Sequence, residues 1–146
     1  MGYTVKEVAV DAILGIRSAE LREGMDLEDC RFEGDTDADT VHLALFHEDV
    51  IVGCLSVLKS SNEDFDAPGQ HQYRGMAVSK AYQGNSIGNL LLKKADEIVR
   101  SRGSRFIWLN ARVIALNFYG RNGYTIQGKG FDIPGVGGHY LMYKEL

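Results

Sequence analysis

The sequence predicts a single α/β domain in which helices and strands follow one another along the chain. Its 146 residues are 45% hydrophobic and 25% charged, which is the profile of one ordinary globular domain. Apolar residues recur with the period of strands in some segments and with that of helices in others. No internal repeat or long linker divides the chain. A chain of this length buries roughly 70% of its unfolded surface, so it needs no disulfide or metal to fold.

The N-terminal part predicts a strand, a helix and an acidic loop. Residues 3–7 alternate between apolar and polar side chains, as a half-buried strand does. Asp11 stands where it can cap a helix, and Gly24 stands where this region ends. The apolar positions of the helix are Ile13, Leu14, Ile16 and Leu21. An acidic loop that contains glycine follows, to about Asp39.

A β-hairpin, a loop and a further strand come next. Residues 41–46 and 50–58 are apolar runs around a turn at Glu48 and Asp49, the pattern of a hairpin. Residues 60–69 are polar and contain proline, which predicts a loop before a strand at 71–78. Cys54 lies in the second apolar run and is expected in the core.

The second half of the chain alternates one long helix with shorter elements. The long helix has its buried face at helical spacing and Gly103 at the place of a C-terminal cap. Its repeating positions are Ile87, Leu90, Leu91, Lys94, Ala95 and Ile98. The remaining elements are a strand at 106–109, a helix at 115–121 and strands at 124–127 and 140–143. Residues 128–138 are rich in glycine and predict a loop.

Charge is divided unevenly along the chain. Residues 1–73 carry 16 acidic and 5 basic side chains, whereas residues 74–146 carry 4 acidic and 11 basic ones. Nine acids fall between Glu20 and Asp39, which indicates either a solvated loop or a surface that attracts a cationic partner. The basic half suits an anionic ligand. Because the net charge is −4, nucleic acid is not expected as the main partner.

The chain start and the cysteines indicate a cytoplasmic protein. The first residues carry no basic region of the signal-peptide kind, and no apolar stretch approaches the roughly 20 residues of a membrane span. Cys30 lies among carboxylates, which disfavour a thiolate, so we expect no nucleophilic role for it.

The segment from Val78 to Gly88 is the main candidate for a binding site. It reads Val-Ser-Lys-Ala-Tyr-Gln-Gly-Asn-Ser-Ile-Gly, a strand end followed by small residues that open into the long helix. The bare N–H groups and the macrodipole at a helix N-terminus attract phosphate or pyrophosphate. A plain strand-to-helix turn is the alternative. A dinucleotide fingerprint and a Walker loop both fail, since the acid and the lysine that they require are missing.

Residues 84–88 also match the G-x-S-x-G nucleophile elbow. Asp132 and then His139 follow Ser86 in the order of a hydrolase triad. An elbow serine comes directly after a strand, however, whereas the strand here ends near Val78. A serine hydrolase is therefore kept only as a remote alternative.

Gln83-Gly84-Asn85-Ser86-Ile87-Gly88 resembles the acetyl-CoA signature Q/R-x-x-G-x-G/A of the GNAT superfamily of N-acetyltransferases, with Ser86 where glycine is usual. Downstream, Asn110 ends a strand, and Ala115 to Tyr124 resembles the second signature, A-x-x-F-Y-x-x-x-G-F/Y. The two signatures span about 74–124, and the predicted element order fits the family over the whole chain. The C-terminal residues 131–142 are similar to small bacterial members of the ElaA-like branch.

The resemblance implies one domain over residues 1–146, with a central mixed, mostly antiparallel sheet flanked by helices. It implies acetyl-CoA as co-substrate and no metal. The residues implied to bind acetyl-CoA are Met76, Ala77, Val78, Gln83, Gly84, Asn85, Ser86, Ile87, Gly88, Asn110, Asn117 and Tyr119. For the two asparagines, Asn110 and Asn117, local capping is the alternative.

The implied reaction is acetyl transfer to a primary amine of a small molecule or protein by direct attack in a ternary complex. The backbone N–H of Val78 would stabilise the oxyanion, and Tyr119 would face the departing sulfur. Residues 70–75 contain no carboxylate that could serve as base, which leaves His71, His139 or a water chain.

The acidic segment favours a cationic acceptor such as a polyamine, an aminoglycoside-like sugar or a protein amino group. Its candidate contacts are Asp35, Asp37 and Asp39. The missing carboxylate base keeps a second hypothesis, a domain that binds acetyl-CoA as a sensing ligand without turnover. The acceptor, the acyl-chain preference and the oligomeric state stay open, with a homodimer as one option.

Overall fold

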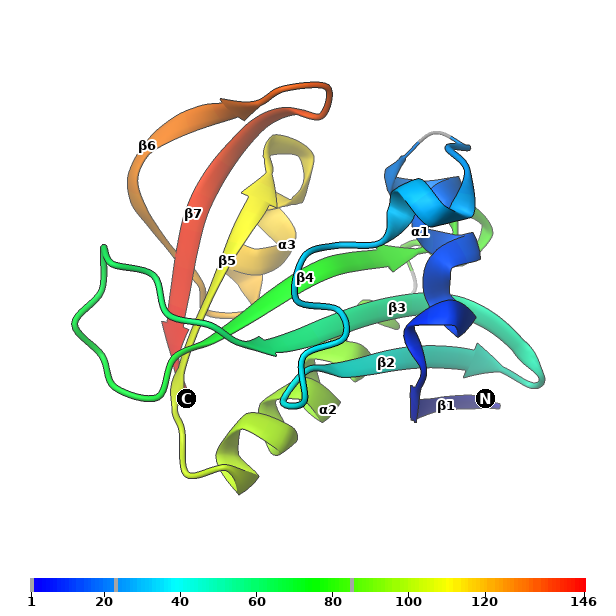
Figure 1. Ribbon diagram of the computed structural model, residues 1–146, viewed down its shortest axis with the longest axis horizontal. Helices are drawn as coiled ribbons and strands as arrows, with labels where there is room; N and C mark the ends of the chain where they lie inside the picture. Colours follow the sequence, from blue (N-terminus) through cyan, green and yellow to red (C-terminus); the bar gives the residue numbers. More distant parts are fainter. Residues whose placement is uncertain (1, 23, 85) are drawn as a thin grey trace.

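A mixed β-sheet runs through the molecule. The computed structural model describes residues 2–22, 24–84 and 86–146, and within them seven strands pair in the order β1-β2-β3-β4-β5-β7-β6 (Figure 1). All neighbours are antiparallel except β4 and β5, so the expected mostly antiparallel sheet is confirmed. The strands are β1 (Tyr3–Val8), β2 (Val41–His47), β3 (Val50–Lys59), β4 (His71–Val78), β5 (Phe106–Arg112), β6 (Thr125–Ile133) and β7 (Gly137–Glu145).

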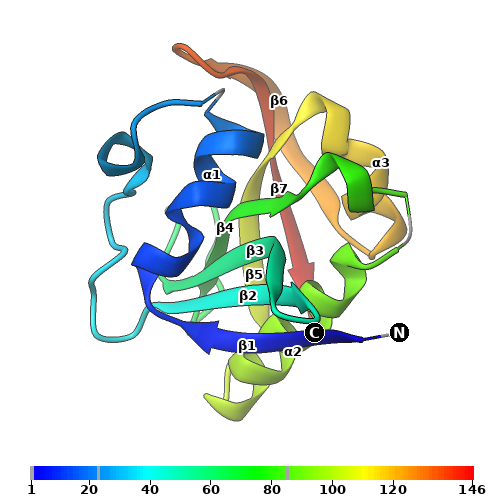
Figure 2. The same cartoon turned by 90° about the vertical axis from the view of Figure 1, so that its right-hand side faces the viewer.

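Helices cover both faces of this sheet, as Figures 1 and 2 show. The α-helices are α1 (Leu14–Leu21), α2 (Gly88–Ser101) and α3 (Leu116–Arg121). Short 3₁₀ turns occupy Val10–Ile13, Leu27–Cys30, Lys80–Tyr82 and Val113–Ala115. In the part of the chain that the structure describes, no helix is both long and apolar enough to cross a membrane.

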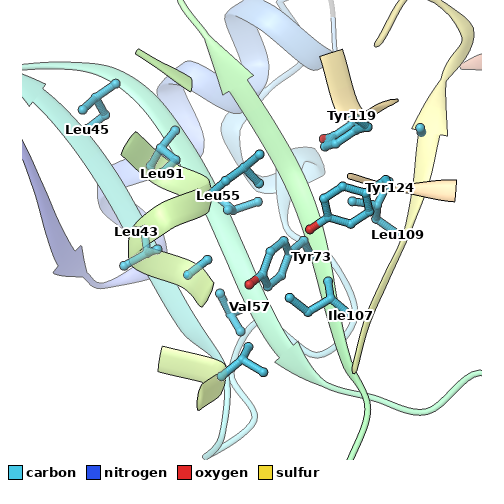
Figure 3. Close-up of a cluster of buried hydrophobic side chains, with 14 of the residues drawn as sticks. Leu43, Leu45, Leu55, Val57, Tyr73, Leu91, Ile107, Leu109, Tyr119 and Tyr124 are labelled. Atoms are coloured by element: carbon cyan, nitrogen blue, oxygen red, sulfur yellow. The ribbon is translucent and has the colours of Figure 1, made fainter. Parts of the chain in front are cut away.

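The main core lies between the sheet and α2. Leu43 and Leu45 of β2 point to this face together with Leu55 and Val57 of β3, because alternate strand residues share a face. They pack against Leu91 of α2, and Figure 3 shows this cluster continuing to the tyrosines near β5. The helical spacing of buried residues in α2 therefore predicted this helix correctly.

The opposite face carries a smaller cluster beneath α1. Ala44 and Cys54 alternate with the large side chains of the α2 face and pack against Ile13 and Ile16. Small residues here let α1 lie close to the sheet. Cys54 is fully buried, as expected, and burial raises the pKa of its thiol to about 12, so it is unreactive at neutral pH.

Two predictions of local structure are wrong. The glycine-rich segment expected as a loop is a hairpin, because β6 continues to Ile133 and β7 begins at Gly137. Eight of the nine residues of β6 are exposed, so this edge strand lacks the buried alternation by which a sequence indicates a strand. Asp11 does not cap an α-helix; it lies in a 3₁₀ turn and its carboxylate pairs with Arg31 at 2.8 Å.

Candidate active site

The site begins where β4 and β5 separate. These parallel strands pair only at His71 with Ile107 and at Gln72 with Trp108, and Figure 1 shows them diverging beyond that point. On its other edge β4 stays paired with β3 as far as Val78. One edge of β4 is therefore open along its second half.

A β-bulge in β4 accompanies this separation. Cys54 pairs with Ala77 and Ser56 pairs with Arg74, so β4 contains one more residue than β3 between these two pairs. Gly75 lies in the bulge with a φ of +65°, a conformation that favours glycine. Bulges bend the strand that carries them, and this one lies in the half of β4 that no longer pairs with β5.

The end of β4 directs a backbone donor into the opening. Ser79 donates its N–H to the carbonyl of Val52 on β3 at 2.8 Å. Because successive strand residues direct their N–H groups to opposite edges, the N–H of Val78 is directed towards the open edge. The carbonyl of Val78 accepts a 2.8 Å hydrogen bond from Nε2 of Gln83, which ties the following loop to the strand.

A cleft of about 920 Å³ lies in the opening between β4 and β5. At one end it is lined by Gln83, Gly84, Ser86, Ile87 and Gly88, which lead into the N-terminus of α2. A Cβ atom at Gly84 would meet nothing within 4 Å, so the backbone is open to a ligand there. This end of the cleft has the donors and the space that an anion requires.

Ser86 has a φ of +61°, which is unusual for a residue with a side chain. Glycine adopts this conformation without strain, and the signature that the segment resembles has glycine at this position. The serine therefore fits the loop at some conformational cost.

Tyr119 of α3 reaches the middle of the cleft. Its side chain is buried against Phe118 and Tyr124, and Figure 3 shows the rings of Tyr119 and Tyr124. Its hydroxyl donates to the thioether sulfur of Met76 at 3.6 Å. Burial raises the pKa of Tyr119 above that of a free tyrosine, so the hydroxyl keeps its proton and acts as a donor.

Most of the residues implied to bind acetyl-CoA line this one cleft. They are Met76, Ala77, Val78, Gln83, Gly84, Ser86, Ile87, Gly88, Asn110 and Tyr119. Asn85 lies outside the described residues. Asn117 is exposed on α3 and does not line the cleft, whereas its neighbours Phe118 and Tyr119 do.

The two candidate histidines have different surroundings. His71 lies outside the lining of the cleft, where its Nδ1 bonds the carbonyl of Gly69 at 3.1 Å and its Nε2 accepts from Arg102 at 3.2 Å. Burial lowers the pKa of His71, and nearby Arg102 adds to this, so its imidazole is neutral at pH 7 and both ring nitrogens are engaged within the protein. His139 lines the cleft.

The hydrolase triad is not formed. Nδ1 of His139 bonds the carbonyl of Gly137 at 2.8 Å, and among the described residues no hydrogen bond joins His139 to Asp132 or Ser86. The arrangement therefore lacks the base-to-nucleophile contact of a serine hydrolase.

The acidic segment does not form an acceptor surface at the cleft. Asp35 is buried and makes two hydrogen bonds to Arg17, at 2.7 and 3.0 Å. Asp37 and Asp39 are exposed but do not line the cleft. Of the acids that the structure describes between residues 20 and 39, only Glu20 lines it. The three aspartates expected to contact a cationic acceptor therefore do not line the cleft.

Sequence reasoning missed several residues of the cleft. Asn89 and Phe118 line the end near α2 and α3, whereas Arg22, Arg74 and Arg112 line the end near α1. Isolated arginines on separate elements carry no local pattern, so only the fold shows that they meet.

Comparison with known proteins agrees with this geometry. Residues 10–124 match the model of the acetyltransferase (GNAT) family. The uncharacterized N-acetyltransferase YitI of Bacillus subtilis is 30% identical over 142 residues, which are 97% of this chain and 95% of YitI.

Solved structures have the same fold at lower identity. A putative N-acetyltransferase of Lactobacillus plantarum is 21% identical with a TM-score of 0.81, over 100% of this chain and 99% of its own. ElaA of Escherichia coli is 21% identical with a TM-score of 0.76, over 98% and 99%. The PaiA N-acetyltransferase of Thermoplasma acidophilum, solved with coenzyme A, is 15% identical with a TM-score of 0.73, over 100% of both chains. With the family model matching most of its length, the chain belongs to the acetyltransferase (GNAT) family and is an acetyl-CoA-dependent acetyltransferase.

Proposed function

We propose that this protein transfers the acetyl group of acetyl-CoA to a primary amine by direct attack within a ternary complex. The observation that carries the proposal is the opening between β4 and β5, where the free edge of β4 and the Tyr119 hydroxyl meet in one cleft. Its volume of about 920 Å³ lies within the range of small-molecule sites, roughly 300–1,000 Å³.

The chain's residues fit coenzyme A. Gly84, Ser86 and Gly88 would bind the pyrophosphate through backbone N–H groups at the start of α2, with Gln83 and Ile87 completing this part of the site. Space at Gly84 supports this assignment, because a Cβ atom there would meet nothing within 4 Å, whereas a Cβ atom at Gly88 would lie 3.2 Å from Cε of Met76, so Gly88 lets the helix start pack against that side chain.

The pantetheine arm would pair with the open edge of β4, at Met76, Ala77 and Val78. Amide groups find both donors and acceptors on such an edge. Asn110 lines the cleft from β5, on the other side of the opening, and its side-chain amide can both donate and accept hydrogen bonds.

When bound, acetyl-CoA supplies the acetyl group as a thioester, and its thiol leaves when the amine attacks. The N–H of Val78 would stabilise the oxyanion, since a fixed donor needs no reorganisation. Tyr119 would donate a hydrogen bond to the departing sulfur, as its hydroxyl already does to the sulfur of Met76. Complete proton transfer from an ordinary tyrosine to the thiolate is uphill by roughly 2 kcal/mol, and the raised pKa of Tyr119 makes it harder.

The amine must lose a proton before it attacks. An alkylamine with a pKa of about 10.4 is neutral in only about one molecule in 2,500 at pH 7, which costs roughly 4.6 kcal/mol. His139 is the imidazole in the cleft, and its Nδ1 must be the protonated nitrogen because it faces a carbonyl. Its Nε2 therefore has the lone pair to accept this proton, directly or through water.

Two measurements on the purified protein test the proposal. Calorimetric titration with acetyl-CoA should show micromolar binding, and a thiol-release assay should show turnover with some members of an amine panel. Tyr119→Phe should lower the rate of release without weakening acetyl-CoA binding. Binding without release on any amine would favour a sensing domain, and the absence of binding would contradict the proposal at its first step.

A further inference from the structure

The end of the cleft next to α1 is basic. It is lined by Arg22, Arg74 and Arg112, with Glu20 as its carboxylate among the described lining residues. We propose that the acceptor amine also carries an anionic group, a carboxylate or a phosphate, and that these three arginines bind it. This inference rests on the proposed acetyl transfer and specifies its second substrate.

Two of the arginines are held by one aromatic ring. The guanidinium carbons of Arg22 and Arg74 lie 5.2 and 4.6 Å from the ring centroid of Phe32. The buried Arg17 contacts the same ring at 4.0 Å and is itself neutralised by Asp35. A guanidinium stacked on an aromatic ring keeps its N–H donors at the edge of its plane, where they can bind a planar or tetrahedral anion.

Arg112 joins them from the end of β5. Its Nη2 donates to the carbonyl of Leu21 at 2.7 Å, across 91 positions of sequence, which holds the side chain beside Arg22. Three arginines from separate parts of the chain thus contribute to the lining of one cleft. Convergence of this kind places several charge-assisted donors around one anion.

These arginines are not paired with carboxylates. Among the described residues, ion pairs within 4 Å join only Arg17 to Asp35 and Arg31 to Asp11 and Glu28. Arg74 and Arg112 reach backbone carbonyls, which carry dipoles but no net charge.

Arg74 also lies in an environment that disfavours its charge. Burial lowers the pKa of Arg74; Arg17 and Arg22 lower it further, while Asp35 and Glu33 oppose this shift. A bound anion would relieve this repulsion.

The position of the cluster separates it from the pyrophosphate end. Residues 83–88 lead into α2, which packs on one face of the sheet, whereas Arg22 and Phe32 follow α1, which packs on the opposite face (Figure 2). The two basic features therefore approach the opening from different sides. If the pyrophosphate occupies the start of α2, the arginine cluster is left for the acceptor.

The first test compares acceptors with and without the anion, at matched concentrations of the neutral amine. Amino acids are paired with their carboxamides, phosphoethanolamine with ethanolamine, and spermidine and kanamycin represent cationic amines. We expect the specificity constant for thiol release to be at least about 10-fold higher for the anionic member of a pair, and the two sets distinguish carboxylate from phosphate. Equal rates, or faster release with the cationic amines, would overturn the inference while leaving the transferase function intact. Release with none of the amines, despite acetyl-CoA binding, would contradict both.

The second test removes the guanidinium groups one at a time. Arg22→Gln, Arg74→Gln and Arg112→Gln should each raise the acceptor KM by about 10- to 100-fold, the loss expected for a charge-assisted hydrogen bond, with the acetyl-CoA Kd unchanged. Arg31→Gln is the matched control, because Arg31 is exposed and pairs with Asp11 and Glu28 away from the cleft.

Two outcomes of this second test are decisive against the inference. Weaker binding of acetyl-CoA by the three variants would show that the arginines bind coenzyme A. An unchanged acceptor KM would show that they do not bind the acceptor. If a glutamine variant does not fold, the lysine variant at the same position replaces it. Lysine keeps the charge but loses the fork of donors, so the acceptor KM should still rise.

Discussion

Gly75→Ala tests whether the bulge in β4 depends on the absence of a side chain. A Cβ atom at this position would lie 2.8 Å from Cε2 of Phe32 and 3.4 Å from Nε of Arg17. It would also hold an alanine at a φ of +65°. The left-handed conformation costs about 1–2 kcal/mol, and the overpacking against Phe32 costs about 1–3 kcal/mol more. We therefore expect the variant to lose about 2–5 kcal/mol of unfolding free energy.

Gly103→Ala is the matched control for this substitution. Gly103 has a φ of +76°, but a Cβ atom there would meet nothing within 4 Å. This variant should show the conformational cost alone, about 1–2 kcal/mol. Urea unfolding measures both free energies, and in thermal scans the Gly75 variant should melt roughly 5–15 °C below the wild type.

Equal losses in the two variants would refute the packing argument at Gly75. A functional readout follows from the same contact, because Phe32 holds Arg22 and Arg74. Displacement of the ring should raise the acceptor KM. A weakened acetyl-CoA Kd with a normal acceptor KM would contradict this link between the bulge and the acceptor.

Three further substitutions test other parts of the site. Tyr119→Phe should lower kcat by about 10- to 100-fold, since a hydrogen bond to a charged sulfur is lost, and steady-state kinetics with unchanged kcat would exclude that role. Ser86→Gly should raise the unfolding free energy by about 0.5–1 kcal/mol, because glycine adopts the φ of +61° without strain; a loss of stability on urea unfolding would show that the hydroxyl makes a compensating contact. Asp35→Asn should cost about 3–5 kcal/mol at pH 7, because it leaves the buried Arg17 without its counter-charge. Burial opposes ionisation of Asp35, but hydrogen bonds from Arg17 and the N–H of Phe32 outweigh it and lower the pKa of its carboxyl. Its stabilisation is therefore present above the unfolded pKa of about 3.9 and lost as the pH falls through the lower folded value, so the variant should match the wild type in stability only in strong acid.

Local patterns predicted most of the fold. The spacing of apolar residues in α2 predicted that helix, and the apolar runs around Glu48 and Asp49 predicted the hairpin of β2 and β3. Both patterns arise because a regular element buries one face, and that face repeats within a few residues of sequence. The sequence did not predict the full length of β6, because this exposed edge strand has no buried face and therefore no repeating apolar pattern.

The end of the site next to α2 was also visible in the sequence. Each of the two signatures is a contiguous segment, so its members that line the cleft were already neighbours in the sequence. The signature did not indicate that Asn117 is exposed while Tyr119 is buried, because successive helix residues point about 100° apart.

The electrostatic character of the acceptor end was decided by the tertiary structure alone. By itself the sequence determined an α/β domain, and it predicted an anion-binding loop before α2 and a tyrosine that faces the departing sulfur. It also showed an acidic N-terminal half, from which a cationic acceptor was expected. Folding pairs Asp35 with Arg17 and joins Arg112 to Leu21 across 91 positions, so the cleft is lined by guanidinium groups instead. Charges neutralise or reinforce one another according to distance in space, and sequence separation does not determine that distance.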